Sequence, residues 1–117
     1  MTTAPSQYRV MDRETLKAKI DRKDRFHLWN VLGQDNYRAE VNIEGSRWMA
    51  VYNITESAVA AVVASKGETI VVYCGSRTSP ASKLAARKLT EMGYTNVFAF
   101  EGGLMDWTNG GFPTVTI

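Results

Sequence analysis

The chain has 117 residues, of which 44% are hydrophobic and 22% charged, and this composition is typical of one globular domain. Its formal net charge is +2 and its basic residues are scattered, which disfavours a nucleic acid as the partner. The single cysteine excludes an internal disulfide and a zinc site built on cysteines, and a free thiol fits a reducing compartment.

The start of the sequence is polar, and no long apolar run occurs anywhere in it. We expect residues 1–7 to form a flexible tail and residues 8–117 to form a single domain. A signal peptide would need an apolar segment near the start, and a membrane span would need about 18 apolar residues in a row. We therefore expect a cytoplasmic protein without a membrane partner.

The first predicted elements are a helix and a strand. Asp12 is suited to cap a helix that brings Leu16 and Ile20 to one face. The charged residues 21–25 predict a solvated turn. The mostly apolar residues 26–32 then predict the strand.

The middle of the chain carries weaker signals. The polar residues 35–40 predict a helical stretch, and residues 48–54 are apolar enough for a strand. Thr55 is expected to cap a helix rich in alanine and valine over residues 56–65, which Gly67 would end.

The second half shows a regular alternation of elements. Residues 69–73 are nearly all apolar, as in a strand buried on both faces of a parallel sheet. Residues 80–92 predict an amphipathic helix that Gly93 ends, residues 96–100 predict the next strand, and residues 104–108 predict a short helix. Strands that alternate with helices indicate an α/β fold with a largely parallel sheet.

The helix over residues 80–92 divides into an apolar and a charged side. We expect an inner face of Leu84, Ala85, Leu89 and Met92, and an outer face of Lys83, Arg87, Lys88 and Glu91.

Cys74 stands where the strand over residues 69–73 ends, and ligands of α/β sheets bind beyond such strand ends. Gly75 and Ser76 are small enough for the backbone to curl and turn its amides toward the sulfur. The helix that opens at Ser79 and Pro80 adds a partial positive charge. This arrangement favours the thiolate over the thiol and suits an anion such as thiosulfate, for which Arg77 adds a fixed cation.

Two other interpretations compete with this one, a packing role for the cysteine and a Cys–His hydrolase. A lone cysteine after an apolar strand can be a buried small hydrophobic residue. His27 is the only histidine, and its place inside a predicted strand disfavours a Cys–His hydrolase.

Residues 71–115 resemble the rhodanese-like domain family: VVYCGSRTSPASKLAARKLTEMGYTNVFAFEGGLMDWTNGGFPTV looks like its strand, active-site loop, helix and closing segment. The most specific part of the likeness is a spaced set of residues in the closing segment, Gly102, Gly103, Trp107, Gly111 and Pro113.

The resemblance implies a three-layer α/β/α domain with a mostly parallel sheet of about five strands. It implies a sulfurtransferase or persulfide carrier in which Cys74 accepts a sulfane sulfur from thiosulfate or a persulfide and passes it to a thiol or cyanide. Neither a cofactor nor a metal is implied, and the partners are small sulfur compounds together with a protein sulfur donor or acceptor. The residues expected to bind the substrate anion are those of the loop, Gly75, Ser76, Arg77, Thr78 and Ser79.

The first half departs from the family pattern. Asn30, Val31 and Leu32 stand where the family usually has Asp-Val-Arg, and residues 40–46 replace its Gly-His-Ile-Pro-Gly-Ala stretch. The electrostatics of the pocket are therefore expected to differ from those of common members.

The loop departs as well. Ser79 stands where common members have an arginine and where a longer-loop variety has a second cysteine. Sulfur must then pass to an external acceptor, and Ser79 is either a helix cap or a substrate contact. Arg47 and Trp48 are candidates for lining the pocket, with ordinary packing as the alternative.

Two other functions remain open. One is a catalytically weak or inactive rhodanese-like binding or sensory module, which the altered Asn30 and Leu32 favour. The other is a phosphatase or arsenate reductase, which Pro80 disfavours because it occupies the place of the arginine that such sites need.

Overall fold

The computed structural model describes residues 7–117, which fold around a five-stranded sheet with the strand order β1-β5-β4-β2-β3. Each neighbouring pair of strands is parallel, so the predicted α/β fold with a mostly parallel sheet is confirmed. Along the chain the elements are β1 (Arg9–Val10), α1 (Arg13–Asp21), β2 (His27–Asn30), β3 (Arg47–Trp48), the 3₁₀ helix η1 (Val51–Asn53), α2 (Glu56–Ala60), β4 (Ile70–Tyr73), α3 (Ala81–Glu91), β5 (Val97–Phe100) and α4 (Gly103–Asn109). Among these described helices, none has the length and hydropathy of a membrane-spanning segment. Of the expected tail, residues 1–6 lie outside the described part.

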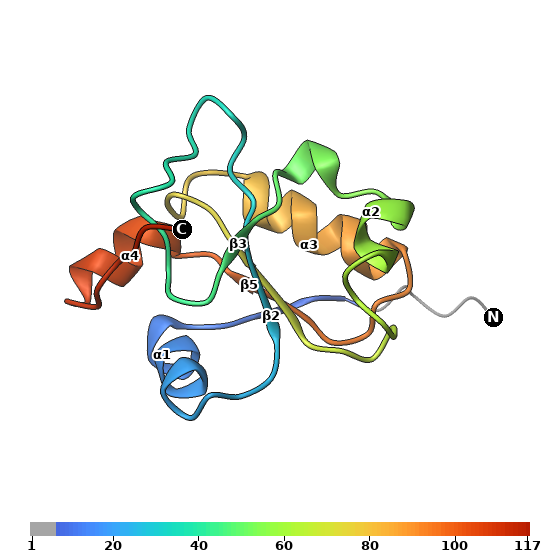
Figure 1. The fold of residues 1–117 in the computed structure, drawn as a ribbon, viewed down its shortest axis with the longest axis horizontal. Coiled ribbons are helices and arrows are strands. Elements are labelled where there is room, and N and C mark those ends of the chain that lie inside the picture. Colours follow the sequence, from blue (N-terminus) through green and yellow to red (C-terminus); the bar gives the residue numbers. More distant parts are fainter. Residues whose placement is uncertain (1–6) are drawn as a thin grey trace.

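Helices cover both faces of the sheet (Figure 1). α2 and α3 lie on one face, where Leu89 belongs to the same apolar cluster as Val72 of β4. α1 and α4 lie on the other face, where Leu16 and Trp107 share a cluster with Val71. Because neighbouring residues of a strand point to opposite faces, β4 contributes to both clusters.

The centre of the fold is β4, which pairs with β2 on one side and β5 on the other. All four of its residues are buried, as expected for an apolar run in a parallel sheet. The edge strands β1 and β3 have two exposed residues each. β1 is too short and too exposed to carry an apolar pattern, so the sequence did not predict it.

Local capping signals at two helix ends are confirmed. Asp12 precedes α1, and its side chain accepts a hydrogen bond from the Thr15 amide at 2.8 Å. Gly93 follows α3 with a φ of +97°, a left-handed conformation that favours glycine at a helix end.

The helical stretch predicted over residues 35–40 is wrong, because the chain forms turns there. The backbone groups of this segment bind the C-terminal segment instead. Asn42 and Val115 exchange two backbone hydrogen bonds of 3.0 and 2.7 Å, and the Ile117 amide donates to the carbonyl of Ala39 at 2.9 Å. Because the two paired segments lie some 70 residues apart in the sequence, no local sequence pattern predicts this pairing.

The predicted strand over residues 48–54 and helix over residues 56–65 are both shorter than expected. The strand is limited to β3, and η1 follows it. Thr55 caps α2 as predicted, but α2 ends at Ala60 rather than near Gly67. The β-branched pair Val62 and Val63 has low helix propensity, and of these two side chains only Val63 is buried.

The predicted inner face of α3 is partly wrong. Leu84 points outward with 45% of its surface exposed, whereas Ala85 and Leu89 are buried as expected. Ser82, Ala86 and Thr90 complete the buried face. Small side chains let α3 lie close to the sheet, and this close packing rather than hydropathy alone decides which face is buried.

Candidate active site

Cys74 directly follows β4 at the carboxyl end of the sheet, the position expected from the sequence. Its side chain has 0% of its surface exposed and belongs to the apolar cluster beneath α3. The alternation of side chains along β4 accounts for this direction, since Val72 lies in the same cluster. The only cysteine is thus central, buried and directed at a helix.

Oxygen atoms surround the sulfur. The Cys74 thiol lies 3.4 Å from Ser82 Oγ, 3.6 Å from the carbonyl oxygen of Ser76 and 3.7 Å from that of Ser79. Within residues 7–117, no loop amide donates a hydrogen bond to the sulfur, which differs from the expected turn of the amides at Gly75 and Ser76 toward it. The Ser79 amide donates to the Ser76 carbonyl at 3.1 Å instead.

Ser82 is a functional candidate that the sequence reasoning missed. Its side chain is fully buried, and Cys74 Sγ is the single hydrogen-bond partner of its hydroxyl among the described residues. A hydroxyl can accept a hydrogen bond from a thiol and can donate one to a thiolate. The available signal was a serine at a buried position of a helix rich in alanine and leucine.

The first turn of α4 holds the chain on either side of the nucleophile. The Leu104 amide donates to the carbonyl of Cys74 at 2.9 Å, and the Met105 amide donates to that of Gly75 at 2.8 Å. Gly103 has a φ of +68°, and a Cβ atom there would lie 2.5 Å from the Cys74 carbonyl oxygen. The residue must therefore be glycine for the helix to approach the loop this closely.

The remaining residues of the closing segment fix α4 in place. Trp107 is buried between Phe100 and Phe112, and its indole Nε1 donates to the carbonyl of Pro113 at 2.8 Å. Gly111 reverses the chain with a φ of +80°. Trp107, Gly111 and Pro113 therefore hold α4 against the nucleophile loop.

A cavity of about 430 Å³ opens beside the loop. The residues that line it are Leu32, Asn36, Arg38, Val41, Gly75, Ser76, Ser79 and Leu104. Three of the five loop residues expected to bind substrate are among them. Thr78 instead pairs its hydroxyl with that of Ser76 at 3.0 Å, and Arg77 is exposed outside the cavity lining.

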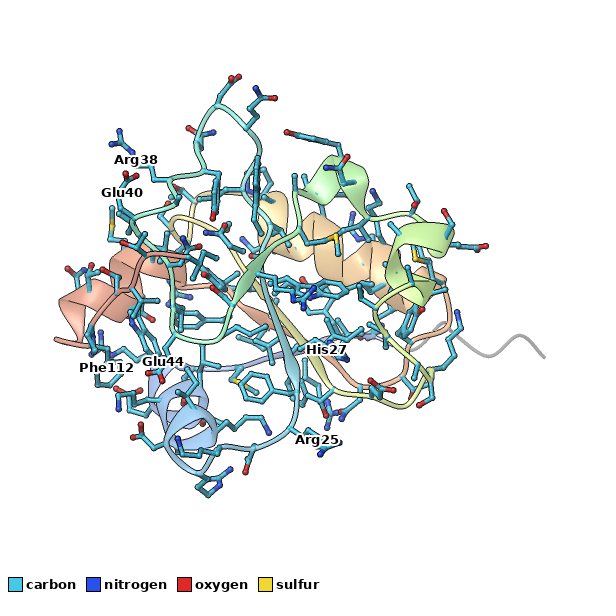
Figure 2. All side chains as sticks on the ribbon, viewed as in Figure 1. Arg25, His27, Arg38, Glu40, Glu44 and Phe112 are labelled. Atoms are coloured by element: carbon cyan, nitrogen blue, oxygen red, sulfur yellow. The ribbon has the colours of Figure 1, made fainter. Side chains whose placement is uncertain are left out.

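Arg38 is the one charged residue of the cavity lining, whereas the sequence reasoning had expected Arg77 to supply the cation. It comes from the turn segment that was predicted to be helical, far from Cys74 in the sequence. Figure 2 shows it on the loop that follows β2. No local motif marked it, because its position depends on how that loop folds back over the site.

Arg47 and Trp48 do not line this cavity. Trp48 stacks on Tyr37 with a ring separation of 4.2 Å, and its Nε1 donates to the carbonyl of Leu32 at 2.7 Å. Arg47 borders a different hollow together with Trp29. Trp48 is therefore a packing residue that supports the cavity wall, which was the alternative interpretation.

His27 lies at the opposite end of the sheet from Cys74, since it pairs with Ile70 at the start of β4. Its Nε2 is 2.8 Å from a carboxylate oxygen of Glu68. This hydrogen bond holds the pKa of Glu68 below its usual range. His27 is thus a structural residue and not a base for Cys74.

A buried polar network lies at the positions where this chain departs from the family pattern, residues 30–32 and 40–46. Asn30 donates to Asn42 Oδ1 at 2.9 Å, and its own side-chain oxygen accepts from the Leu32 amide at 3.1 Å. The Tyr73 hydroxyl lies 2.8 Å from Ser46 Oγ, and burial raises the pKa of Tyr73. Asn30 thus positions Leu32 by hydrogen bonding without a charge.

Ser79 does not cap α3. The helix begins at Ala81 with Pro80 as its capping position, one residue later than predicted, and no side chain completes the cap. Ser79 Oγ accepts only a long contact of 3.5 Å from the Ala81 amide.

The sequence model of the rhodanese-like domain family matches residues 12–110. No curated protein matches the chain significantly. Among solved structures, a rhodanese-like domain from Anabaena is similar with a TM-score of 0.76 and 22% identity, over 98% of this chain and 81% of that one. A thiosulfate sulfurtransferase from Pseudomonas aeruginosa has a TM-score of 0.78 and 21% identity, over 91% of this chain and 20% of that one.

A rhodanese from E. coli, solved with anions, is similar with a TM-score of 0.62 and 29% identity, over 80% of this chain and 100% of that one. The family match spans most of the chain, and the solved rhodanese-like domains share its parallel sheet. The chain belongs to the rhodanese-like domain family.

Proposed function

We propose that this protein is a sulfurtransferase in which Cys74 carries a sulfane sulfur as a persulfide. The observation that supports this most is the placement of the chain's single thiol at the carboxyl end of the central strand, against the Ser82 hydroxyl and next to a cavity of about 430 Å³. The similarity to a thiosulfate sulfurtransferase adds to it.

The reaction has two displacement steps. In the first, the Cys74 thiolate attacks the outer sulfur of thiosulfate, a new S–S bond forms, and the old S–S bond breaks so that sulfite leaves with its electron pair. In the second, a thiolate or cyanide attacks the outer sulfur of the persulfide, and Cys74 leaves as the thiolate. This is covalent catalysis with a ping-pong order.

The hydroxyl of Ser82 has a defined role in this scheme. As the cysteine sulfur gains negative charge when it leaves, the hydroxyl rotates and donates a hydrogen bond to it. Hydrogen bonds to charged groups are stronger than those between neutral groups. Because Ser82 is itself fully buried, water does not compete for this bond.

Access to the sulfur requires movement of the loop. The Cys74 side chain has no exposed surface, and the cavity is bordered by Gly75, Ser76 and Ser79 rather than by the thiol. A donor held in the cavity therefore reaches Sγ when residues 75–79 shift. We further propose a reducing compartment such as the cytoplasm, where the free thiol persists, with small sulfur compounds as substrates.

Intact-mass spectrometry tests the proposal. After incubation with thiosulfate or glutathione persulfide and removal of the donor, the protein is expected to gain the mass of one sulfur atom. Cys74→Ser is the matched control and is expected to gain nothing. Treating the sulfur-loaded protein with cyanide should release thiocyanate and restore the original mass.

The full burial of the thiol favours one second candidate, a binding module without sulfur transfer. That function predicts no mass gain with either donor from a protein that remains folded. It also predicts that Cys74→Ser leaves partner binding intact. A single loading experiment therefore separates the two functions.

A further inference from the structure

The cavity beside the loop combines three aliphatic side chains with uncharged polar side chains and one cation. We propose that it selects an organic sulfane-sulfur donor, a monoanionic thiosulfonate or persulfide with an apolar body, over inorganic thiosulfate. This inference rests on the proposed function, because it concerns the donor of the same reaction.

The size of the cavity exceeds what an inorganic donor fills. The volume is about 430 Å³, within the range of roughly 300 to 1,000 Å³ for sites of organic ligands. Thiosulfate has five heavy atoms and takes about 150 Å³ at roughly 30 Å³ for each water-sized atom. About two-thirds of the space would then remain without contact to the donor.

The walls match an apolar body. Leu32, Val41 and Leu104 provide aliphatic surface. The Leu32 wall is preformed, since its amide is held by the Asn30 side chain at 3.1 Å and its carbonyl by Trp48 at 2.7 Å. A preformed wall loses little conformational freedom when a ligand binds.

The polar groups of the cavity match one negative charge. Arg38 is the single charged residue of the lining, and no carboxylate shares it. Within the part of the chain that the structure describes, none of the ion pairs engages Arg38. The Arg38 side chain is exposed where its loop borders the cavity, and a forked guanidinium suits the two oxygens of a sulfonyl or carboxylate group.

A series of donors with the same reacting group tests the inference. Thiosulfate, methanethiosulfonate and benzenethiosulfonate each lose the outer sulfur, and cyanide serves as the common acceptor. Each kcat/KM is divided by the rate constant of the uncatalysed reaction with cyanide. We expect the normalised value for benzenethiosulfonate to exceed those of the two smaller donors by about tenfold or more, from burial of the ring.

The role of Arg38 is tested with Arg38→Met. This variant is expected to raise KM for benzenethiosulfonate about fivefold or more with kcat nearly unchanged, and Arg38→Lys is expected to recover part of the loss. The matched control is Arg25→Met, which removes an exposed arginine at the other end of the molecule (Figure 2). High salt should reduce the difference between wild type and Arg38→Met, because exposed charges are screened.

The outcomes separate this inference from the proposed function. Equal normalised values for the three donors, or an Arg38→Met variant with unchanged KM, would overturn the donor selectivity while sulfur transfer stands. If none of the donors loads sulfur on Cys74 of the folded wild-type protein, both the function and the selectivity fail.

Discussion

Replacing Gly103 by alanine is expected to damage both the stability and the activity of the protein. Gly103 has a φ of +68°, and an added Cβ atom would lie 2.5 Å from the Cys74 carbonyl oxygen and 2.8 Å from the backbone of Gly75 and Ser76. Backbone atoms cannot rotate away as a side chain can. α4 or the nucleophile loop must therefore move.

The size of the effect follows from two contributions. A non-glycine residue in the left-handed region costs about 1 to 2 kcal/mol. Forcing an extra group into a packed site adds about 1 to 3 kcal/mol. Gly103→Ala should thus lower the free energy of unfolding by about 2 to 5 kcal/mol, and a loop displaced by about 1 Å should reduce kcat/KM for sulfur transfer about 100-fold.

Gly111→Ala is the matched control for this prediction. Gly111 has a similar φ of +80°, but nothing lies within 4 Å of the added Cβ atom, so only the first contribution of about 1 to 2 kcal/mol applies. Urea denaturation gives both free energies, and thiocyanate formation gives the activity. Equal losses of stability in the two variants, with activity retained in Gly103→Ala, would refute the close contact between α4 and the loop.

Three further predictions concern single side chains. Ser82→Ala should slow the alkylation of Cys74 by iodoacetamide at neutral pH about tenfold, because the thiolate loses its hydroxyl donor. The free energy of unfolding should change by less than about 1 kcal/mol. An unchanged alkylation rate would contradict the role of Ser82 as a donor. Burial raises the pKa of Tyr73 in the folded state. The contribution of Tyr73 to the free energy of unfolding is therefore fully present below its unfolded pKa of about 10, and it is lost as the pH rises through the folded pKa. Tyr73→Phe should therefore weaken the loss of stability that wild type shows in urea titrations from pH 9 to pH 12. At pH 7 the variant should have a free energy of unfolding lower by about 1 to 3 kcal/mol. An alkaline profile identical to that of wild type would show that Tyr73 does not cause this loss. Asp12→Ala removes the cap of α1 and should lower the urea midpoint by the equivalent of about 1 kcal/mol; no change would mean that the hydrogen bond to the Thr15 amide contributes nothing.

Strong local signals account for what the sequence predicted correctly. The apolar run of β4 marks a strand buried on both sides, and Cys74 necessarily follows it. Asp12 and Gly93 mark helix ends because capping depends on the side chain or the φ of one residue. The short helix predicted over residues 104–108 is confirmed as α4, which lies in the closing segment that carries the family resemblance.

Long-range contacts account for what the sequence did not predict. Arg38 reaches the cavity because its loop binds the C-terminal segment through Asn42 and Val115, a contact that no local pattern encodes. Ser82 faces the sulfur because α3 packs on the sheet through small residues, which also turns Leu84 outward. The peptide groups of Cys74 and Gly75 are held by the amides of Leu104 and Met105, so the backbone at the nucleophile depends on α4, a distant part of the chain.

The complete burial of Cys74 also bears on the chemical lifetime of the thiol. Oxidation of a cysteine to sulfenic and then sulfinic acid follows its exposure. A sulfur enclosed by Ser76, Ser79 and Ser82 would meet peroxide only when the loop opens, and under the proposed function the same openings would admit the sulfur donor. The frequency of loop opening would then set the turnover rate and the rate of irreversible inactivation together, so a more open loop would yield a faster enzyme with a shorter working life.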